Sequence, residues 1–285
     1  MIPEPGDAGF CARLPVVRRA RGYRLYDSAG RRYVDLWQLH GHAILGHRGA
    51  GASAVMKNAI SKGLIMDLPS AAAGRLVRVL RELLPSHPFV RVYGSLDRCL
   101  QGLAAWCGRS VRAADVVDPA TAEGDRPASA DQASAPGAIV AWRPFLPSWE
   151  YADALALLPI LPFATCGGPW AVCLREDPRD ALPQSEPICA AVLEATVRAV
   201  AGLRRHSEGP LGPLVAPVAV GRWQIRGPYV TPRFARERYG EVFDAFLRGG
   251  VILSPRWSCP SLLPATLSDG EIAKTVGLFR AIPAQ

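Results

Sequence analysis

Lysine is nearly absent from this chain of 285 residues, which contains only Lys57, Lys62 and Lys274 against 30 arginines. The formal net charge of +8 therefore comes from arginine, whose guanidinium binds phosphate and carboxylate groups. A nucleic-acid-binding domain clusters such charge on one face and interleaves it with aromatic residues. Here the basic pairs are spread along the chain, as in "VRRARG" and "LRRHSEG". We therefore expect no nucleic-acid partner.

The chain also lacks long apolar runs and paired cysteines. No stretch approaches the roughly 18 consecutive apolar residues of a membrane span, and the N-terminal segment does not resemble a secretory signal. An odd number of cysteines without a CxxC pair argues against a disulfide framework and a zinc site. We expect a cytoplasmic protein with buried reduced thiols, no membrane association and no bound metal. The cysteines are Cys11, Cys99, Cys107, Cys166, Cys173, Cys189 and Cys259.

Apolar periodicity predicts strands that alternate with helices. Ser95 is a candidate N-cap, and Ser268 with Glu271 forms a candidate capping box. In the first part we expect a hairpin at 21–38, helices at 54–64, 71–84 and 95–110, and a strand at 89–94. In the second part we expect strands at 138–142, 215–225 and 251–255, a strand, Gly-Gly turn and second strand within 158–177, and helices at 148–158, 187–205, 233–250 and 268–282.

Composition divides the chain into three parts. Residues 113–137 have almost no bulky apolar side chains, which predicts a flexible insert. We expect an N-terminal hairpin and loop segment at 1–50, a large α/β domain at 51–206 that contains this insert, and a small α+β domain at 207–285. Because strands and helices alternate in the middle part, its sheet is expected to be mostly parallel with helices on both faces.

Four stretches in this order resemble one known family. They are "GYRLYDSAGRRYVDL", "HAILGH", "LLPSHPFVRVYGSLDRCLQGLAAWC" and "GVILSPRWSCPSLLPATLSDGEIAKTV". Together they are similar to class III aminotransferases, which depend on pyridoxal phosphate, and most of all to glutamate-1-semialdehyde aminomutases. The likeness covers about 1–110 and 138–285. It implies a fold-type-I aminotransferase-like three-layer sandwich with a reduced, mostly parallel sheet, plus a smaller C-terminal α+β domain.

The resemblance places a phenylalanine where the family has its essential lysine. Family members hold the coenzyme covalently through a lysine that begins a Lys-Ala-apolar-Gly-Gly-Gly turn. The matching residues here are 163–168, "FATCGG", so Phe163 stands at the lysine position. Lys57, Lys62 and Lys274 are expected on exposed helix faces. No catalytic residue is therefore assigned.

Three further family positions are altered. The phosphate-binding turn Ser-Gly-Thr-Glu-Ala corresponds to "YGSLDR", where Gly94 and Ser95 can still offer N–H groups but Asp97 would repel an anion. A capped structural helix is the alternative explanation of this turn. The threonine of the partner subunit that contacts the phosphate falls at Leu182. The aspartate that holds the pyridine nitrogen has only Asp153 as a candidate, on an expected helix.

Other chemistry rests on weaker patterns. His40, His42 and His47 could hold zinc, although no carboxylate or cysteine is close in sequence, and ordinary loop histidines are the alternative. Cys166 could be a nucleophile, or simply a buried thiol. Aromatic residues such as Phe163 and Trp170 are expected to fill the space that a coenzyme would need.

These departures predict a degenerate class III aminotransferase-like protein that is catalytically inactive, has no cofactor and acts through protein contacts. The expected partner is a second copy of the chain or a related protein. Two alternatives stay open. One is an active pyridoxal-phosphate-dependent aminotransferase or aminomutase, and the other is a module that binds a phosphate ligand at Gly94 and Ser95.

Overall fold

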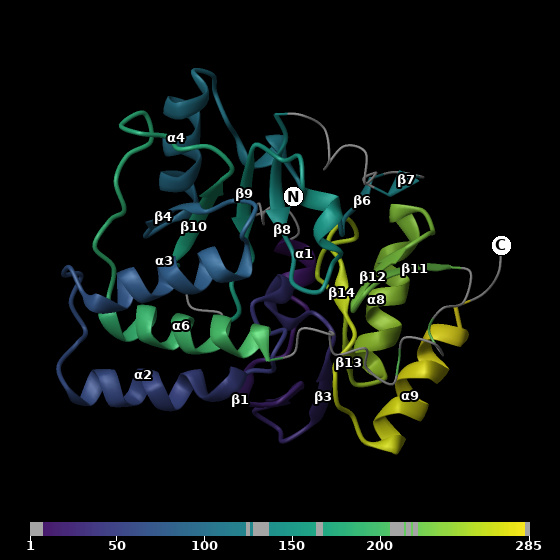
Figure 1. The fold of residues 1–285 in the computed structure, drawn as a ribbon. Helices are drawn as coiled ribbons and strands as arrows, with labels where there is room; N and C mark the ends of the chain where they lie inside the picture. Colours follow the sequence, from purple (N-terminus) through teal and green to yellow (C-terminus); the bar gives the residue numbers. More distant parts are fainter. Residues whose placement is uncertain are drawn as a thin grey trace. The chain divides into compact units, whose positions relative to one another are not determined.

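The computed structural model describes residues 8–123, 126–127, 137–163, 168–205, 214, 218 and 222–282 (Figure 1). The described chain divides into two compact units. The first contains residues 49–119, 137–163 and 168–205. The second contains residues 8–48, 120–123, 126–127, 214, 218 and 222–282.

A five-stranded sheet forms the centre of the first unit, in the order β4-β10-β9-β8-β5. Strand β10 is antiparallel to both β4 and β9, whereas β9, β8 and β5 are parallel to one another. Four of the five strands therefore point the same way, which confirms the expected small, mostly parallel sheet. The strands are β4 (Phe89–Tyr93), β5 (Val116–Val117), β8 (Ile139–Trp142), β9 (Ala156–Pro159) and β10 (Trp170–Leu174).

Helices cover both faces of this sheet. Val172 and Leu174 pack with α4 (Leu96–Cys107), while the alternate residues Ala171 and Cys173 are fully buried on the opposite face. On that side α3 (Ala71–Leu83) packs against β4 and α6 (Ala190–Arg204), and α6 packs against α2 (Ala52–Ser61) (Figure 1). This is the layered α/β arrangement that the resemblance implies.

The second unit is an α+β structure with an aromatic core that includes Tyr239, Phe243, Phe246 and Phe279. Its sheets have the orders β1-β2-β3-β13 and β11-β12-β14, beside the two-stranded pair β6-β7. None of the helices that the structure describes, in either unit, is long and apolar enough to cross a membrane. The strands are β1 (Val17–Arg21), β2 (Arg24–Asp27), β3 (Arg32–Asp35), β6 (Ala122–Glu123), β7 (Arg126–Pro127), β11 (Trp223–Arg226), β12 (Tyr229–Pro232), β13 (Val251–Ile252) and β14 (Ser261–Leu262), and the helices are α1 (Ala8–Cys11), α8 (Tyr239–Arg248) and α9 (Asp269–Arg280).

The N-terminal hairpin differs from the segment expected at 1–50. Strand β3 pairs in parallel with β13, so that Val34 lies opposite Val251 and the hairpin completes a sheet of the second unit. The sequence contains the hairpin signal, but a pairing between residues more than 200 positions apart leaves no local pattern. The hairpin is therefore part of the same compact unit as the C-terminal residues.

The stretch 113–137 differs from the expected flexible insert at its start. Val116 and Val117 form the edge strand β5 and pair with Ile139 and Val140 of β8. Asp118 is almost fully buried. Two valines in a polar stretch suffice for a strand because β8 supplies the hydrogen-bonding edge. Residues 124–125 and 128–136 of the expected insert lie outside the described part.

The helix expected at 148–158 is wrong. A single 3-10 turn spans Ser148–Tyr151, and the chain then enters strand β9. The stretch 156–161 is apolar and buried at every position. A strand inside a parallel sheet is covered on both faces, so its sequence is a continuous apolar run. Such a run shows no alternation of polar and apolar residues, and its periodicity cannot distinguish a strand from a buried helix.

Candidate functional site

The turn between β4 and α4 is the predicted phosphate turn. Strand β4 ends at Tyr93, and α4 begins after Ser95, whose hydroxyl oxygen accepts a hydrogen bond of 3.2 Å from the Arg98 N–H. Ser95 is therefore the N-cap that the sequence predicts, which confirms the capped helix. Gly94 precedes the cap, and its N–H points to a neighbouring segment of the chain.

That neighbouring segment places a carboxylate on the turn. The Gly94 N–H donates to Oε2 of Glu186 at 3.1 Å, and Arg98 Nε donates to Oε1 at 2.6 Å. The Glu186 side chain is 25% exposed. Sequence reasoning missed Glu186 because it is 92 residues from Gly94 and lies in "PQSEP", which reads as an ordinary loop.

The segment that carries Glu186 is bonded along β4. The Glu186 N–H donates to Val92 O at 2.9 Å, and the Val92 N–H donates to the Ser185 hydroxyl oxygen at 3.0 Å. The Tyr93 hydroxyl donates to Pro183 O at 2.7 Å. We call residues 182–186 the β4 strap. Its backbone fixes the Glu186 side chain over the start of α4.

Leu182, at the family's threonine position, begins the β4 strap as a core residue. It is 1% exposed and packs in the cluster that contains Tyr93 and Leu103. A Cβ on Gly102 would lie 3.3 Å from Leu182 Cδ1, so α4 and the strap are in close contact. The side chain of Leu182 has no hydrogen-bonding group that it could offer to a phosphate.

Gly168 lies against the same turn. A Cβ at this position would lie 2.7 Å from Gly94 O, so only glycine fits here without a shift of the backbone. Its φ of +124° also favours glycine. Residues 164–167, which include Cys166, lie outside the described part, and the expectation for that thiol stays a prediction.

Phe163, at the lysine position, packs into an apolar cluster. Its neighbours are Ala52 of α2, Ala195 and Ala199 of α6, and the partly buried Met56. The three alanines are at most 2% exposed. The backbone of Phe163 has a φ of +89°, which is unusual for a residue other than glycine. The side chain of Phe163 is partly buried and packs against alanines of α2 and α6.

Strand β9 is where the coenzyme-anchoring aspartate would be expected. It lies between β8 and β10 in the sheet, and its residues Ala156–Pro159 are all apolar and buried. Asp153 precedes it in a turn and not on the expected helix. Its carboxylate is 61% exposed and pairs with Arg175 at 3.2 Å. Asp153 therefore forms an ion pair with Arg175 at the protein surface.

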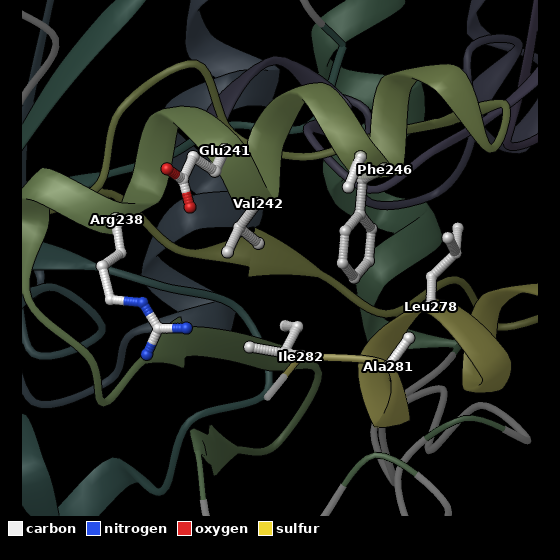
Figure 2. A pocket seen from close by; sticks show the side chains of 8 residues that line it. Arg238, Glu241, Val242, Phe246, Leu278, Ala281 and Ile282 are labelled. Carbon is white, nitrogen blue, oxygen red and sulfur yellow. The ribbon is translucent and has the colours of Figure 1, made fainter. Parts of the chain in front are cut away.

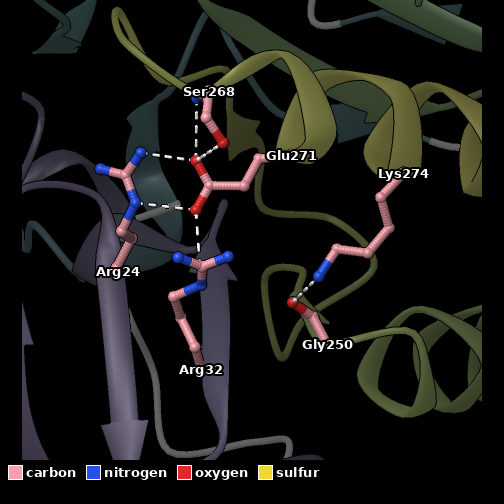
Figure 3. Close-up of polar contacts among 6 residues, drawn as sticks. All are labelled: Arg24, Arg32, Gly250, Ser268, Glu271 and Lys274. Atoms are coloured by element: carbon pink, nitrogen blue, oxygen red, sulfur yellow. Dashed lines mark hydrogen bonds and ion pairs between the residues drawn. The ribbon is translucent and has the colours of Figure 1, made fainter.

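The three lysines lie on α2 and α9. Lys57 and the C-cap residue Lys62 are exposed at α2. Lys274 Nζ lies 3.4 Å from Gly250 O, close to the group formed by Arg24, Arg32 and Glu271 (Figure 3). Burial lowers the pKa of Lys274, and the positive charge of Arg32 lowers it further. Lys274 belongs to the second unit, in which it supports the junction of α8 and β13.

The histidine-rich loop is organised around Asp35 at the end of β3. His47 Nε2 lies 2.7 Å from Oδ2 of this buried carboxylate, and Oδ1 accepts from the N–H groups of Trp37 and Gln38 at 2.9 Å each. Gln38, Leu39 and His40 all have positive φ. Among the residues described, no group of three His, Cys, Asp or Glu side chains is arranged to hold a metal.

A pocket that sequence reasoning missed lies between α8 and α9 (Figure 2). Its volume is about 210 Å³. Apolar side chains form most of its wall, and Arg238 and Glu241 lie at one end. Such a pocket is small compared with drug-sized sites, which span about 300–1,000 Å³. The lining residues are Arg238, Glu241, Val242, Ala245, Phe246, Leu278, Ala281 and Ile282.

Among the described residues of the first unit, those at the predicted coenzyme positions do not fit pyridoxal phosphate. Phe163 stands where the resemblance predicts the lysine, β9 has no carboxylate for the pyridine nitrogen, and the predicted phosphate turn faces the negative charge of Glu186. A phosphate would meet repulsion from Glu186 and from Asp97 in the first turn of α4. In the described part of the first unit, these predicted positions therefore do not match the coenzyme.

Comparison with known sequences finds no matching family model. An uncharacterized protein of Treponema pallidum is 28% identical over 315 residues, which cover 92% of each chain. A glutamate-1-semialdehyde 2,1-aminomutase of Heliobacterium modesticaldum is 36% identical over 84 residues, which cover 29% of this chain and 19% of that enzyme.

Solved structures share the fold along almost the whole chain. The ornithine aminotransferase of Plasmodium yoelii has a TM-score of 0.67 at 14% identity and covers 93% of this chain and 92% of its own. The N-acetylornithine aminotransferase of Stenotrophomonas maltophilia has a TM-score of 0.61 at 16% identity, with 94% and 95% covered. The chain therefore has the fold of class III aminotransferases, as its sequence suggests.

Proposed function

We propose that the protein is a catalytically silent class III aminotransferase-like scaffold that acts through protein contacts. The observation that carries this proposal is the packing of Phe163 against α2 and α6. A covalent hold on a carbonyl coenzyme requires an amine at this place. A phenyl ring supplies none, and it fills the apolar space with side-chain volume.

The remaining lysines support the same conclusion. Lys57 and Lys62 are exposed to water at α2, where no surrounding side chains among the described residues form a closed coenzyme site. Lys274 lies in the second unit beside Arg32 and Glu271.

An exposed apolar segment at the end of α2 and directly after it supports the proposal that the protein acts through protein contacts. Ile65 and Met66 are each 60% exposed, and Ile60, Leu64 and Leu68 are close to half exposed. The segment is held in place because the Ala191 N–H donates to Leu64 O at 3.0 Å. Contiguous exposed apolar side chains of this kind are typical of protein interfaces. A second copy of the chain is the partner we propose.

Borohydride trapping tests the catalytic part of the proposal. The protein is incubated with pyridoxal phosphate, scanned for absorbance near the visible edge, reduced and digested. We expect only weak, non-saturating labelling of surface lysines, which a variant carrying Lys57→Arg, Lys62→Arg and Lys274→Arg abolishes. A stoichiometric, saturable band fixed to one lysine peptide would show that the protein binds the coenzyme and would end this proposal.

A further inference from the structure

The start of α4 has the features of an anion site. The helix has 12 residues, so its N-terminal end carries a substantial positive partial charge. The Gly94 N–H and the Arg98 guanidinium point to one place, and the anion at that place is the Glu186 carboxylate. Both of its oxygens are used, one by each donor.

We propose that Glu186 is a built-in ligand of this turn, so that the native protein does not bind phosphate there. The proposal goes beyond catalytic silence, since it would hold whether or not the lysine position were intact. It also assigns a role to a residue that no sequence pattern singles out. We further infer that removal of the Glu186 charge uncovers a site for inorganic phosphate or a phosphate monoester.

The β4 strap gives this internal ligand its advantage over a free anion. Three hydrogen bonds join residues 183–186 to Val92 and Tyr93, and Leu182 anchors the strap in the core. A tethered group competes at an effective concentration of about millimolar or more, without losing translational freedom. A free phosphate must displace Glu186 and approach Asp97 at the same time, so repulsion adds to its cost.

The turn itself is already shaped without any ligand. Ser95 caps the helix through the Arg98 N–H, and Gly168 packs against Gly94 O. The backbone of the turn, with the Gly94 N–H, is therefore held by contacts that do not involve the Glu186 side chain. Removal of the carboxylate charge leaves the Gly94 N–H in place, and the Arg98 guanidinium, which is 61% exposed, can turn to another anion.

Phosphate titration of three proteins tests the proposal. The native protein, Glu186→Gln and Glu194→Gln are titrated with inorganic phosphate by calorimetry, with chloride at equal ionic strength as the reference. Glu194 is a matched control because it forms a similar partly buried pair, with Arg75 on α3. We expect at least about tenfold tighter phosphate binding by Glu186→Gln than by the other two proteins. Addition of Arg98→Ala to Glu186→Gln should remove that gain.

Equal phosphate affinity of the native protein and a folded Glu186→Gln variant would overturn the proposal. A measurement on the native protein keeps the test valid if the variant does not fold. In an amide NMR spectrum, the Gly94 resonance should stay unmoved as phosphate is added. A saturable shift of that resonance would show that phosphate displaces Glu186, which would also overturn the proposal.

Discussion

Glu271 shows how one buried carboxylate joins two parts of the second unit. It is the third residue of α9 and is 3% exposed, and its Oε2 accepts from both the N–H and the hydroxyl of Ser268 at 2.9 and 3.0 Å (Figure 3). Arg24 of β2 donates to its two oxygens as a fork, with the Nε bond at 2.7 Å. Arg32 of β3 lies 3.7 Å away. The capping box predicted from the sequence is confirmed, and the arginine fork comes in addition.

The balance of these effects sets the charge of Glu271. Burial by itself raises the pKa of a carboxyl group, but the hydrogen bonds from Arg24 and Ser268 outweigh it and lower the pKa of Glu271 from 4.5 to about 2. A group with a lowered pKa in the folded state stabilises the protein above its unfolded pKa. This contribution is lost as the pH falls from about 4.5 towards 2.

Glu271→Gln should therefore cost on the order of 3 kcal/mol of the free energy of unfolding at pH 7. The difference from the native protein should shrink as the pH falls through this window. Urea unfolding at pH 7, 4.5 and 3 measures it, with the exposed Glu237→Gln as the control. A difference that stays constant with pH would contradict the assigned role of the ionised carboxylate.

Capping residues could be predicted from sequence because their contacts are local. Ser95 accepts from a residue three positions on, and Ser268 and Glu271 are also three apart. The bond from Gly94 to Glu186 joins residues 92 positions apart. No rule based on residue spacing predicts such a contact. Only the structure therefore shows that Glu186 occupies the predicted phosphate turn.

The conformations of strands β9 and β5 differ from those that the sequence pattern predicted. The run around β9 was apolar enough for either a helix or a strand, and the sheet decided, because β8 and β10 supply hydrogen bonds on both sides. For β5 the surrounding composition indicated a flexible insert, although two valines pair with β8. In both cases the neighbouring strand decided the conformation and not the local composition.

A buried ion pair fixes β5 against β8. Arg143 follows β8 and donates to both oxygens of Asp118, which follows β5, with the Nε bond at 2.8 Å. The two side chains are 2% and 1% exposed. A fully buried pair contributes little net stability compared with apolar residues, but loss of one partner leaves an uncompensated charge.

Arg143→Met alone should destabilise the protein by about 3–5 kcal/mol, whereas Arg143→Met combined with Asp118→Leu should recover much of that loss. Chemical unfolding of both variants measures the difference. The exposed pair of Asp153 and Arg175 is the matched control, and Asp153→Asn should change stability by about 0.5 kcal/mol or less. Equal losses in the single and double variants would show that the pair is not coupled.

The fold extends over nearly the whole chain, whereas the described residues at the predicted coenzyme positions differ from those of the family. Structures at 12–16% identity share the fold along more than nine tenths of this chain. A fold of this kind is maintained by apolar packing, which tolerates many sequences, whereas a coenzyme site requires particular groups at particular places. The apolar packing of Phe163 against Ala52, Ala195 and Ala199 agrees with this difference between the requirements of a fold and those of a coenzyme site.

Association of the chain should depend on the exposed segment after α2. In sedimentation velocity over a range of concentrations, we expect the native protein to dimerise and the variant Ile65→Ser with Met66→Ser to do so at least about tenfold more weakly, since each serine removes apolar contact area. Val16→Ser is the control, because Val16 is 78% exposed but lies in the other unit. A native protein that stays monomeric, or a variant that dimerises equally well, would contradict this interface.

The sequence alone determined the fold class, most helices and the caps, because each depends on local spacing or on the order of recognisable segments. Tertiary structure alone decided the partners of those elements. It paired the N-terminal hairpin with β13, packed Phe163 against alanines of α2 and α6, and put Glu186 on the turn before α4. These contacts join residues far apart in the chain, where packing and charge act through space and leave no trace in the order of the residues.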